Sequence, residues 1–346
     1  MSMDKHSLVG LLPQDMSSFI ESVGEPLYRA RQVTEWIYRK KVPSFDHMST
    51  LPQSLRDALK KNFFLAQGKI VHTLTSHDGT VKYLVAFPDG QAVEAVSIPQ
   101  GKRLTLCVSS QVGCAVGCPY CATGKAGFTR DLESQEIVEE VWMAQKANDQ
   151  RIGNLVFMGM GEPLLNYTNL SRAILVLNHP QGMGIGTRHI TVSTTGVPSK
   201  MVQLARDWEQ VNLAVSLHAP DNDLRTELVP VSRAWPLREV MEAVDEVIGL
   251  TNRRMTVEYT LWNGINDLVS HAHALAALCR GRLLHVNLIP GNPGGGKRFR
   301  PSSLPRVLTF QGILREKGIP VTIRKERGRD IQAACGELYR TWTQAE

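Results

Sequence analysis

The sequence predicts an α/β protein built around a partial TIM-like (β/α) barrel, with a small N-terminal helical module and a β-hairpin extension. Three observations predict this fold. The chain opens with helical periodicity, continues with alternating β-branched stretches, and then alternates short apolar strands with amphipathic helices. With 42% hydrophobic and 21% charged residues, the 346-residue chain has a globular composition, which excludes a disordered or collagen-like protein.

The chain carries no sign of export or membrane insertion. Its apolar runs are only a few residues long, and residues 1–10 lack a basic segment followed by an apolar one. We therefore expect a cytoplasmic protein without a membrane partner.

Residues 1–66 predict a helical accessory module. Within Pro26 to Lys41, Val33, Trp36 and Ile37 follow helical spacing, and residues 51–65 repeat an apolar helical period. Tyr28, Trp36 and Tyr38 stand among basic residues in this module, which suggests that it binds RNA, although we expect Trp36 in the core.

Residues 67–103 predict a β meander that forms the extension. The stretch from Lys69 to Pro99 alternates in the manner of strands, and Asp78-Gly79 and Asp89-Gly90 are preferred hairpin turns.

Residues 104–338 predict the barrel, and residues 339–346 a short tail. Helical stretches such as residues 134–147, 236–248 and 270–278 separate strands, which we place at residues 104–108, 154–158, 189–192, 212–216, 256–259, 285–289 and 321–323. Almost every strand runs into a polar or Gly-rich motif, and such barrels carry their chemistry at the C-terminal ends of the strands.

Three of the six cysteines form one compact motif, Cys114-x3-Cys118-x2-Cys121, just after the first barrel strand. Three thiolates from one loop can hold a small cluster, and glycines relieve the backbone crowding. A structural zinc site normally takes four ligands, and no matching cysteine pair or histidine stands at zinc-finger spacing. The motif favours a 4Fe-4S cluster with one open iron, while zinc remains the alternative.

Positive charge is concentrated near the C-terminus. Residues 280–329 contain twelve Lys and Arg against two Glu, a local charge of +10 in a chain whose net charge is +6. A concentrated basic segment suggests a polyanion partner. We expect phosphate contacts from Lys297, Arg298 and Arg300 in a Gly-rich loop, and from Arg324, Lys325, Arg327 and Arg329, although a solvated charged loop is the simpler reading of the Gly-rich stretch.

Five longer strings carry a specific resemblance: CVSSQVGCAVGCPYCATG, FMGMGEPLLNY, SLHAP, NLIPGNP and RKERGRDIQAACGEL. They resemble the RlmN adenosine methyltransferases, a subfamily of the radical S-adenosylmethionine enzymes whose sister group is the Cfr resistance methylases. The likeness covers nearly the whole chain. It implies a radical S-adenosylmethionine barrel with a 4Fe-4S cluster on Cys114, Cys118 and Cys121.

The resemblance also implies the residues that bind S-adenosylmethionine. They all lie at predicted strand ends: Gly161, Glu162, Ser193, Ser216, Leu217, His218 and Asn292. Taken singly, Glu162 could cap a helix, His218 could be a satisfied loop histidine, and Asn292 could form a turn before proline.

By resemblance, Cys335 carries a methyl group, Cys107 resolves the product through a transient disulfide, and Glu94 is the general base. Two S-adenosylmethionine molecules are then used per turnover, one as methyl donor and one as radical source. Carbon 2 of adenine is electrophilic, so direct methyl displacement by that carbon cannot work, which gives the radical route its chemical reason. Without the resemblance, Cys107 would be read as a buried strand residue and Cys335 as a helical thiol; Cys279 we assign to the core.

The substrates implied are an adenosine in 23S rRNA and the adenosine next to the anticodon in tRNA. The mechanism implies two further partners, an electron donor such as flavodoxin or ferredoxin and a disulfide reductant. We expect the enzyme to be a monomer. GEPLLN and RGRDIQAACGEL favour carbon 2 of adenine. A Cfr-like carbon 8 methylase and a non-catalytic, zinc-stabilised RNA-binding protein remain alternatives, and the glycine-rich loop at residues 294–301 departs from the common form in the family.

Overall fold

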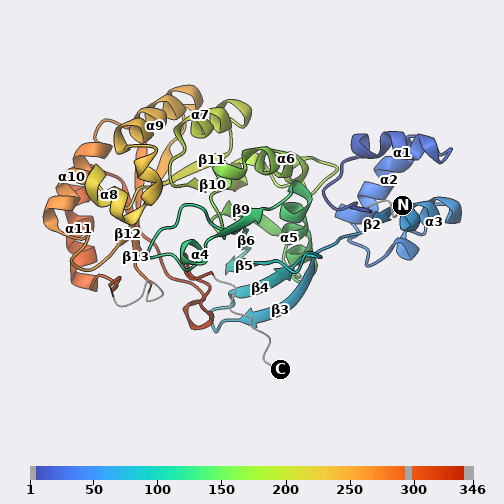
Figure 1. Ribbon diagram of the computed structural model, residues 1–346, viewed down its shortest axis with the longest axis horizontal. Coiled ribbons are helices and arrows are strands. Elements are labelled where there is room, and N and C mark those ends of the chain that lie inside the picture. Colours follow the sequence, from blue (N-terminus) through green and yellow to red (C-terminus); the bar gives the residue numbers. More distant parts are fainter. Residues whose placement is uncertain (1–4, 293–297, 339–346) are drawn as a thin grey trace.

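The computed structural model describes residues 5–292 and 298–338 (Figure 1). A ten-stranded sheet runs through it in the order β14-β13-β12-β11-β10-β9-β6-β5-β4-β3. The sheet has two ends and does not close, so the predicted partial barrel is confirmed.

The barrel strands, from β6 to β14, all pair in parallel. Parallel pairing needs a crossover between successive strands, and helices provide most of these crossovers. The strands are β6 (Arg103–Cys107), β9 (Ile152–Phe157), β10 (Ile190–Thr194), β11 (Asn212–Ser216), β12 (Met255–Leu261), β13 (Leu284–Pro290) and β14 (Val321–Ile323). Each lies within one or two residues of its predicted position.

Helices cover the outside of the curved sheet (Figure 1). They are α5 (Ser134–Lys146), α6 (Tyr167–Asn178), α7 (Pro198–Asp207), α9 (Leu237–Thr251), α10 (Val269–Cys279) and α11 (Leu304–Glu316). Two shorter helices, α4 (Ala122–Lys125) and α8 (Asn222–Leu228), lie in loops that follow barrel strands. No helix in the described part of the chain is long and apolar enough to cross a membrane.

The hairpin extension belongs to the same sheet as the barrel. Strands β3 (Lys69–Thr75), β4 (Val81–Ala86) and β5 (Ala92–Gln100) form an antiparallel meander, and β5 pairs with β6. Gly79 and Gly90 in the two hairpin turns have φ of +82° and +78°, a conformation that favours glycine. The predicted turns are therefore confirmed.

The N-terminal module packs against α5 at one end of the molecule (Figure 1). It contains α1 (Ser17–Ser22), α2 (Tyr28–Tyr38) and α3 (Gln53–Asn62), and β1 (His6–Ser7) pairs in parallel with β2 (Phe63–Phe64). The predicted helical period to residue 65 therefore ends early, because Phe63 and Phe64 turn into a strand. The indole nitrogen of Trp142 donates to the carbonyl of Ile37 at 2.8 Å, which joins α5 to α2. Trp36 is partly buried against the core rather than fully exposed.

Candidate active site

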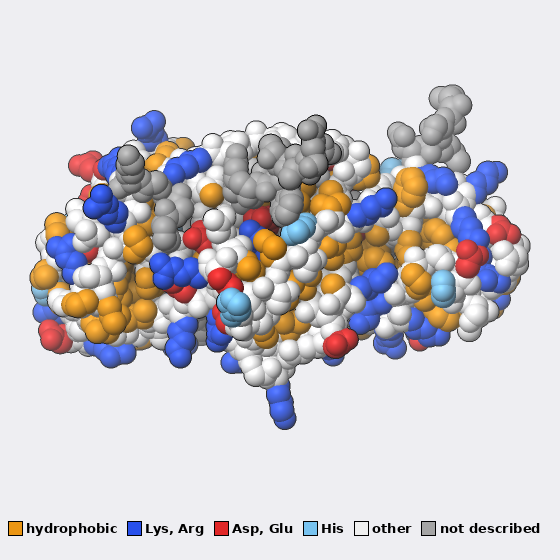
Figure 2. All heavy atoms as spheres, turned by 90° about the horizontal axis from the view of Figure 1, so that it is seen from below, with side chains coloured by type: hydrophobic (Ala, Val, Ile, Leu, Met, Phe, Trp, Pro, Cys, Tyr) orange, Lys and Arg blue, Asp and Glu red, His pale blue; other side chains and the backbone are white. Residues whose placement is uncertain are grey.

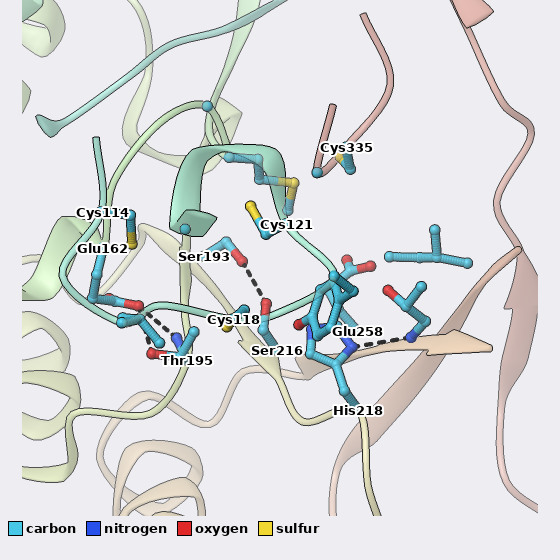
Figure 3. Close-up of a pocket in the computed structure, with 18 of the residues that line it drawn as sticks. Cys114, Cys118, Cys121, Glu162, Ser193, Thr195, Ser216, His218, Glu258 and Cys335 are labelled. Carbon is cyan, nitrogen blue, oxygen red and sulfur yellow. Dashed lines mark hydrogen bonds between the residues drawn. The ribbon is translucent and has the colours of Figure 1, made fainter. Parts of the chain in front are cut away.

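One cavity collects most of the predicted site residues at the C-terminal ends of the barrel strands (Figure 3). Parallel strands place their C-terminal ends at one edge of a sheet, so motifs far apart in the chain meet there. The lining includes Cys114, Cys118, Cys121, Gly161, Glu162, Ser193, Ser216, His218, Asn292 and Cys335. Leu217 lies behind this wall: its side chain is fully buried, and its amide donates to the carbonyl of Glu258 at 3.0 Å.

The three clustered cysteines lie on the loop between β7 (Gln111–Gly113) and β8 (Phe128–Asp131). Gly113, at the start of this loop, has φ of +78°, and a Cβ there would meet the carbonyl oxygen of Gly127. Only glycine allows this close approach. Burial raises the pKa of all three thiols, that of Cys114 to about 12.

The cysteine arrangement fits a multi-iron cluster better than a single ion. Among the described residues, no three Cys, His, Asp or Glu side chains converge closely enough to hold one metal ion. A 4Fe-4S cluster places each cysteine on its own iron, so its ligands stand further apart than those around one tetrahedral zinc ion. The raised pKa values belong to the metal-free thiols, and a bound metal would stabilise the thiolate form against this effect of burial.

Glu162 is held rigidly in the loop after β9. Its Oε2 accepts from the backbone nitrogen of Thr195 at 2.7 Å and from the Thr195 hydroxyl at 2.8 Å, and its Oε1 accepts from the backbone nitrogen of Leu164 at 3.1 Å. Burial raises the pKa of Glu162, and these hydrogen bonds partly offset the rise. Glu162 thus does cap the turn that follows, as the simpler reading expected, and it also lines the cavity.

Gly161 allows the Glu162 loop to pack against the loop before the cysteines. Its φ is +104°, and an added Cβ would lie 2.7 Å from atoms of Ser110 and Gln111. The side-chain oxygen of Gln111 accepts from the backbone nitrogen of Glu162 at 2.8 Å, which joins the two loops.

His218 is a neutral histidine in the wall of the cavity. Its Nδ1 accepts from the backbone nitrogen of Thr260 at 3.0 Å, so the proton of the neutral ring resides on Nε2. Burial lowers the pKa of His218 to about 3, and the positive charge of Arg225 acts in the same direction. Nearby, the hydroxyl oxygens of Ser193 and Ser216 lie 3.4 Å apart.

Asn292 contacts Cys335 and retains an unused acceptor. Its side-chain nitrogen donates to the backbone oxygen of Cys335 at 3.2 Å, while its buried Oδ1 has no partner among the described residues. A buried polar atom without a partner in a cavity wall is what a ligand-binding residue shows before its ligand binds. The residues present therefore fit S-adenosylmethionine.

Cys335 lines a second cavity as well, together with Cys107. The two cysteines therefore line one and the same cavity. Burial and the neighbouring Cys335 both raise the pKa of the Cys107 thiol.

Glu94 is buried on β5, two residues from Val96, which pairs with Cys107. Its Oε1 lies 3.0 Å from Nζ of Lys82. Glu94 is absent from the described residues that line the two cavities. It thus lies on β5, the strand that pairs with the strand of Cys107.

The structure assigns Arg324 to the site, whereas the sequence interpretation placed it among phosphate contacts. The side chain of Arg324 lies in the wall between the two cavities, where it neighbours Cys335. The neighbouring Cys335 chiefly raises the pKa of Arg324, and Glu258 acts in the same direction. Arg298 forms an ion pair with Glu227, and Lys297 lies outside the described residues.

The sequence interpretation did not identify three residues of the site, namely Glu258, Thr195 and Arg225. Glu258 lines the first cavity and accepts from the Asn287 amide at 2.9 Å. Its signal was available, since it is the one charged residue in the apolar strand MTVEYTL. Arg225 is fully buried and donates to the carbonyl of Thr195, but one arginine in the polar helix α8 offers no signal in the sequence.

Fold and site together define a radical S-adenosylmethionine protein, and residues 108–275 match the Radical SAM superfamily. Residues 6–65 match the ribosomal RNA large subunit methyltransferase N-terminal domain. A probable dual-specificity RNA methyltransferase RlmN of Geobacillus kaustophilus is 43% identical, over 96% of this chain and 92% of the relative. A relative of the same name from Thermotoga neapolitana is 44% identical, over 96% of this chain and 97% of the relative.

A solved structure shows the same architecture over nearly the whole chain. The crystal structure of a radical SAM methyltransferase from Sphaerobacter thermophilus superimposes with a TM-score of 0.92 at 44% identity, over 96% of this chain and 99% of that one. The chain belongs to the RlmN family of radical S-adenosylmethionine RNA methyltransferases.

Proposed function

We propose that this enzyme methylates carbon 2 of adenosine in 23S rRNA, and of the adenosine next to the anticodon in tRNA, through an S-methylcysteine intermediate. One observation carries the proposal: Cys335 lines both the cavity of the clustered cysteines and the cavity of Cys107. A methyl carrier must reach a methyl donor, the target base and a resolving thiol, and Cys335 stands at that junction. The names of the relatives, which state dual specificity, support two RNA substrates.

The cofactor residues have distinct proposed roles. Cys114, Cys118 and Cys121 would hold a 4Fe-4S cluster, and S-adenosylmethionine would lie against Gly161, Glu162, Ser193, Asn292 and residues 216–218. When bound, these groups supply the methyl group from one S-adenosylmethionine and a 5′-deoxyadenosyl radical from a second.

The protein side chains then act in sequence. The Cys335 thiolate takes the methyl group by nucleophilic substitution, and after hydrogen removal its methylene carbon becomes bonded to the base. Cys107 attacks the Cys335 sulfur, which forms a disulfide and breaks the bond between that sulfur and the methylene carbon. The electron pair of the broken bond stays with the methylene carbon, which takes up a proton and becomes the methyl group. The one unpaired electron left by the addition to the base would pass to the cluster, when bound. Glu94 accepts the proton that leaves carbon 2.

Two electron sources would complete the cycle. A donor such as flavodoxin or ferredoxin would reduce the cluster, and a thiol reductant would restore Cys107 and Cys335. The need for reduced thiols favours a reducing compartment such as the cytoplasm, and we propose that the enzyme works as a monomer.

The RNA would lie across the face shown in Figure 2. Lys and Arg side chains occur on this face both over the barrel and over the N-terminal module. Phosphate contacts spread over such a distance would position a folded RNA. The target adenosine must be turned out of its stack to reach the second cavity, which favours a loop or a locally opened helix.

Nucleoside mass spectrometry tests the regiochemistry. The reconstituted enzyme, S-adenosylmethionine, a reductant and 23S rRNA or tRNA are incubated, and the digest is compared with standards of 2- and 8-methyladenosine. We expect 2-methyladenosine in both RNAs. The 8-methyl isomer would contradict carbon 2 specificity, and a colourless zinc protein without iron would contradict the radical mechanism.

A further inference from the structure

The turn between β3 and β4 holds the segment that carries Cys335. The hydroxyl of Ser76 donates to Oδ1 of Asp330 at 2.5 Å, and the backbone nitrogen of His77 donates to Oδ2 of Asp330 at 3.2 Å. Both carboxylate oxygens of Asp330 are therefore engaged by a turn some 250 residues away in the chain. The hydrogen bond from Ser76 lowers the pKa of Asp330, so the carboxylate accepts these bonds in its charged form.

A second carboxylate makes the reciprocal contact from the turn. Oδ2 of Asp78 accepts from the backbone nitrogen of Gly328 at 3.2 Å and lies 3.7 Å from a guanidinium nitrogen of Arg327. Gly328 has φ of +62°, and an added Cβ would lie 2.8 Å from Ala333 and 2.9 Å from Thr80. Glycine is needed here because the segment and the turn approach closely.

A third contact comes from β4 itself. Nζ of Lys82 donates to the backbone oxygen of Gln332 at 3.2 Å while it also pairs with Glu94. Gln332 has φ of +51°, a left-handed conformation that is strained for a residue with a side chain. Such a conformation persists only where surrounding contacts impose it, and the hairpin supplies one of those contacts.

The residues that follow Cys335 in the chain are hydrogen-bonded to the loop that carries the three clustered cysteines. The backbone nitrogen of Ala122 donates to the carbonyl of Gly336 at 2.8 Å, and the hydroxyl of Thr123 donates to the carbonyl of Leu338 at 2.6 Å. Cys335 thus lies between two anchor points, one on the hairpin and one beside the clustered cysteines.

We propose that the β3–β4 turn is a clasp in which Asp330 and Asp78 are positioning residues that hold Cys335 at the junction of the two cavities. The proposal rests on the proposed role of Cys335 as methyl carrier. It assigns a function to the hairpin extension and to the Asp330 position of the RGRDIQAAC motif. Loss of the clasp would free the segment from β14 to Cys335 while the sheet stays folded, because the contacts lie outside the strand pairs.

Thiol chemistry on the full-length, cluster-free protein tests the clasp without cofactor or RNA. The alkylation rates of Cys335 and Cys279 by iodoacetamide are measured by peptide mass spectrometry under native conditions. We expect Asp330→Asn and Asp78→Asn to raise the Cys335 rate about tenfold, the effect of losing a charge-assisted hydrogen bond. Buried Cys279 reports global unfolding, so its rate should stay unchanged.

Two further variants separate the effect of the clasp from an effect of charge alone. Gly328→Ala should raise the Cys335 rate by steric means, without changing any charge. Asp89→Asn, in the turn between β4 and β5, removes the ion pair with Arg130 and should leave the Cys335 rate unchanged, which makes it the matched control. In the clasp variants, diamide should also form less Cys107–Cys335 disulfide than in the parent protein.

The outcomes that would overturn the proposal are specific. A Cys335 rate that stays at the parent value in Asp330→Asn and Gly328→Ala would contradict it, and so would an equal rise at Cys279, since that would mean a merely structural contact. If the parent enzyme never carried a methyl group on Cys335, the proposed function would fail, but the alkylation result would still decide whether the clasp exists.

Discussion

Nζ of Lys82 lies 3.0 Å from Oε1 of Glu94, and both side chains are buried within the hairpin extension. Lys82 and Glu94 lie on neighbouring antiparallel strands, β4 and β5. The ion pair therefore joins the proposed general base to the clasp, because Lys82 also donates to Gln332.

Removal of the ammonium group should destabilise the protein strongly. Lys82→Met leaves Glu94 as a buried charge without this cation, and we expect a loss of about 3 kcal/mol in the free energy of unfolding. Urea unfolding of the cluster-free protein measures it. The exposed Lys102→Met variant is the control and should change the free energy by less than about 0.5 kcal/mol. A similar, small effect in both variants would show that the pair contributes little.

The three clustered cysteines should each be needed for iron, whereas the core cysteine should not. Cys114→Ala, Cys118→Ala and Cys121→Ala should retain almost no iron or sulfide after anaerobic reconstitution, because a cluster with two protein ligands is held poorly. Iron and sulfide assays and the visible spectrum measure this. Cys279→Ala, in buried helix α10, should bind iron like the parent protein. Full iron content in any of the three variants would remove that cysteine from the ligand set.

Alanine variants of the two cysteines in the second cavity should block the reaction at different steps. Cys335→Ala should keep the cluster but carry no methyl group derived from S-adenosylmethionine, since the acceptor sulfur is gone. Cys107→Ala should be methylated normally and then accumulate RNA bonded to Cys335, because no second thiol breaks the bond to carbon. Intact-protein mass spectrometry and denaturing gels distinguish these results. A methyl group on the Cys335→Ala protein would overturn the carrier assignment.

His218 should make the folded protein sensitive to acid. The pKa of His218 is about 3 in the folded protein and about 6.5 in an unfolded chain. Below pH 6.5 the unfolded state therefore binds a proton at this histidine that the folded state does not bind. Stability should therefore fall with pH between about 6.5 and 3, by up to about 1.4 kcal/mol per unit from this group. Above pH 6.5 His218 should have no effect.

Unfolding in urea at pH 7.5, 6 and 5 measures this dependence. His218→Gln should flatten the slope, since glutamine does not titrate. His273→Gln, on an exposed position of α10, should leave the slope unchanged. Identical slopes in the parent and in His218→Gln would show that another group dominates the acid response.

Local sequence patterns determined the elements and the identity of the cofactor motif. Strand positions followed from apolar stretches bounded by turns, and the Cys114, Cys118 and Cys121 spacing is contained within one loop. Such features are readable because the interacting residues are close in sequence. The same reason explains the error at residues 63–65, where pairing with β1, more than fifty residues away, ended the helix.

The roles of Arg324 and Asp330 required the folded chain. Arg324 looked like one of several basic residues of an RNA-binding segment, yet it lies between two cavities. No local pattern distinguishes a surface arginine from one turned inward, because the partners come from other strands.

By itself, then, the sequence determined the α/β class, the hairpin turns and the cysteine motif, since short-range periodicity and spacing encode them. Only the tertiary structure decided that Cys335 joins the two cavities, that Lys82 accompanies Glu94, and that the β3–β4 turn grips the Cys335 segment. These contacts form between residues far apart in the chain, and the curvature and strand order of the sheet bring them together.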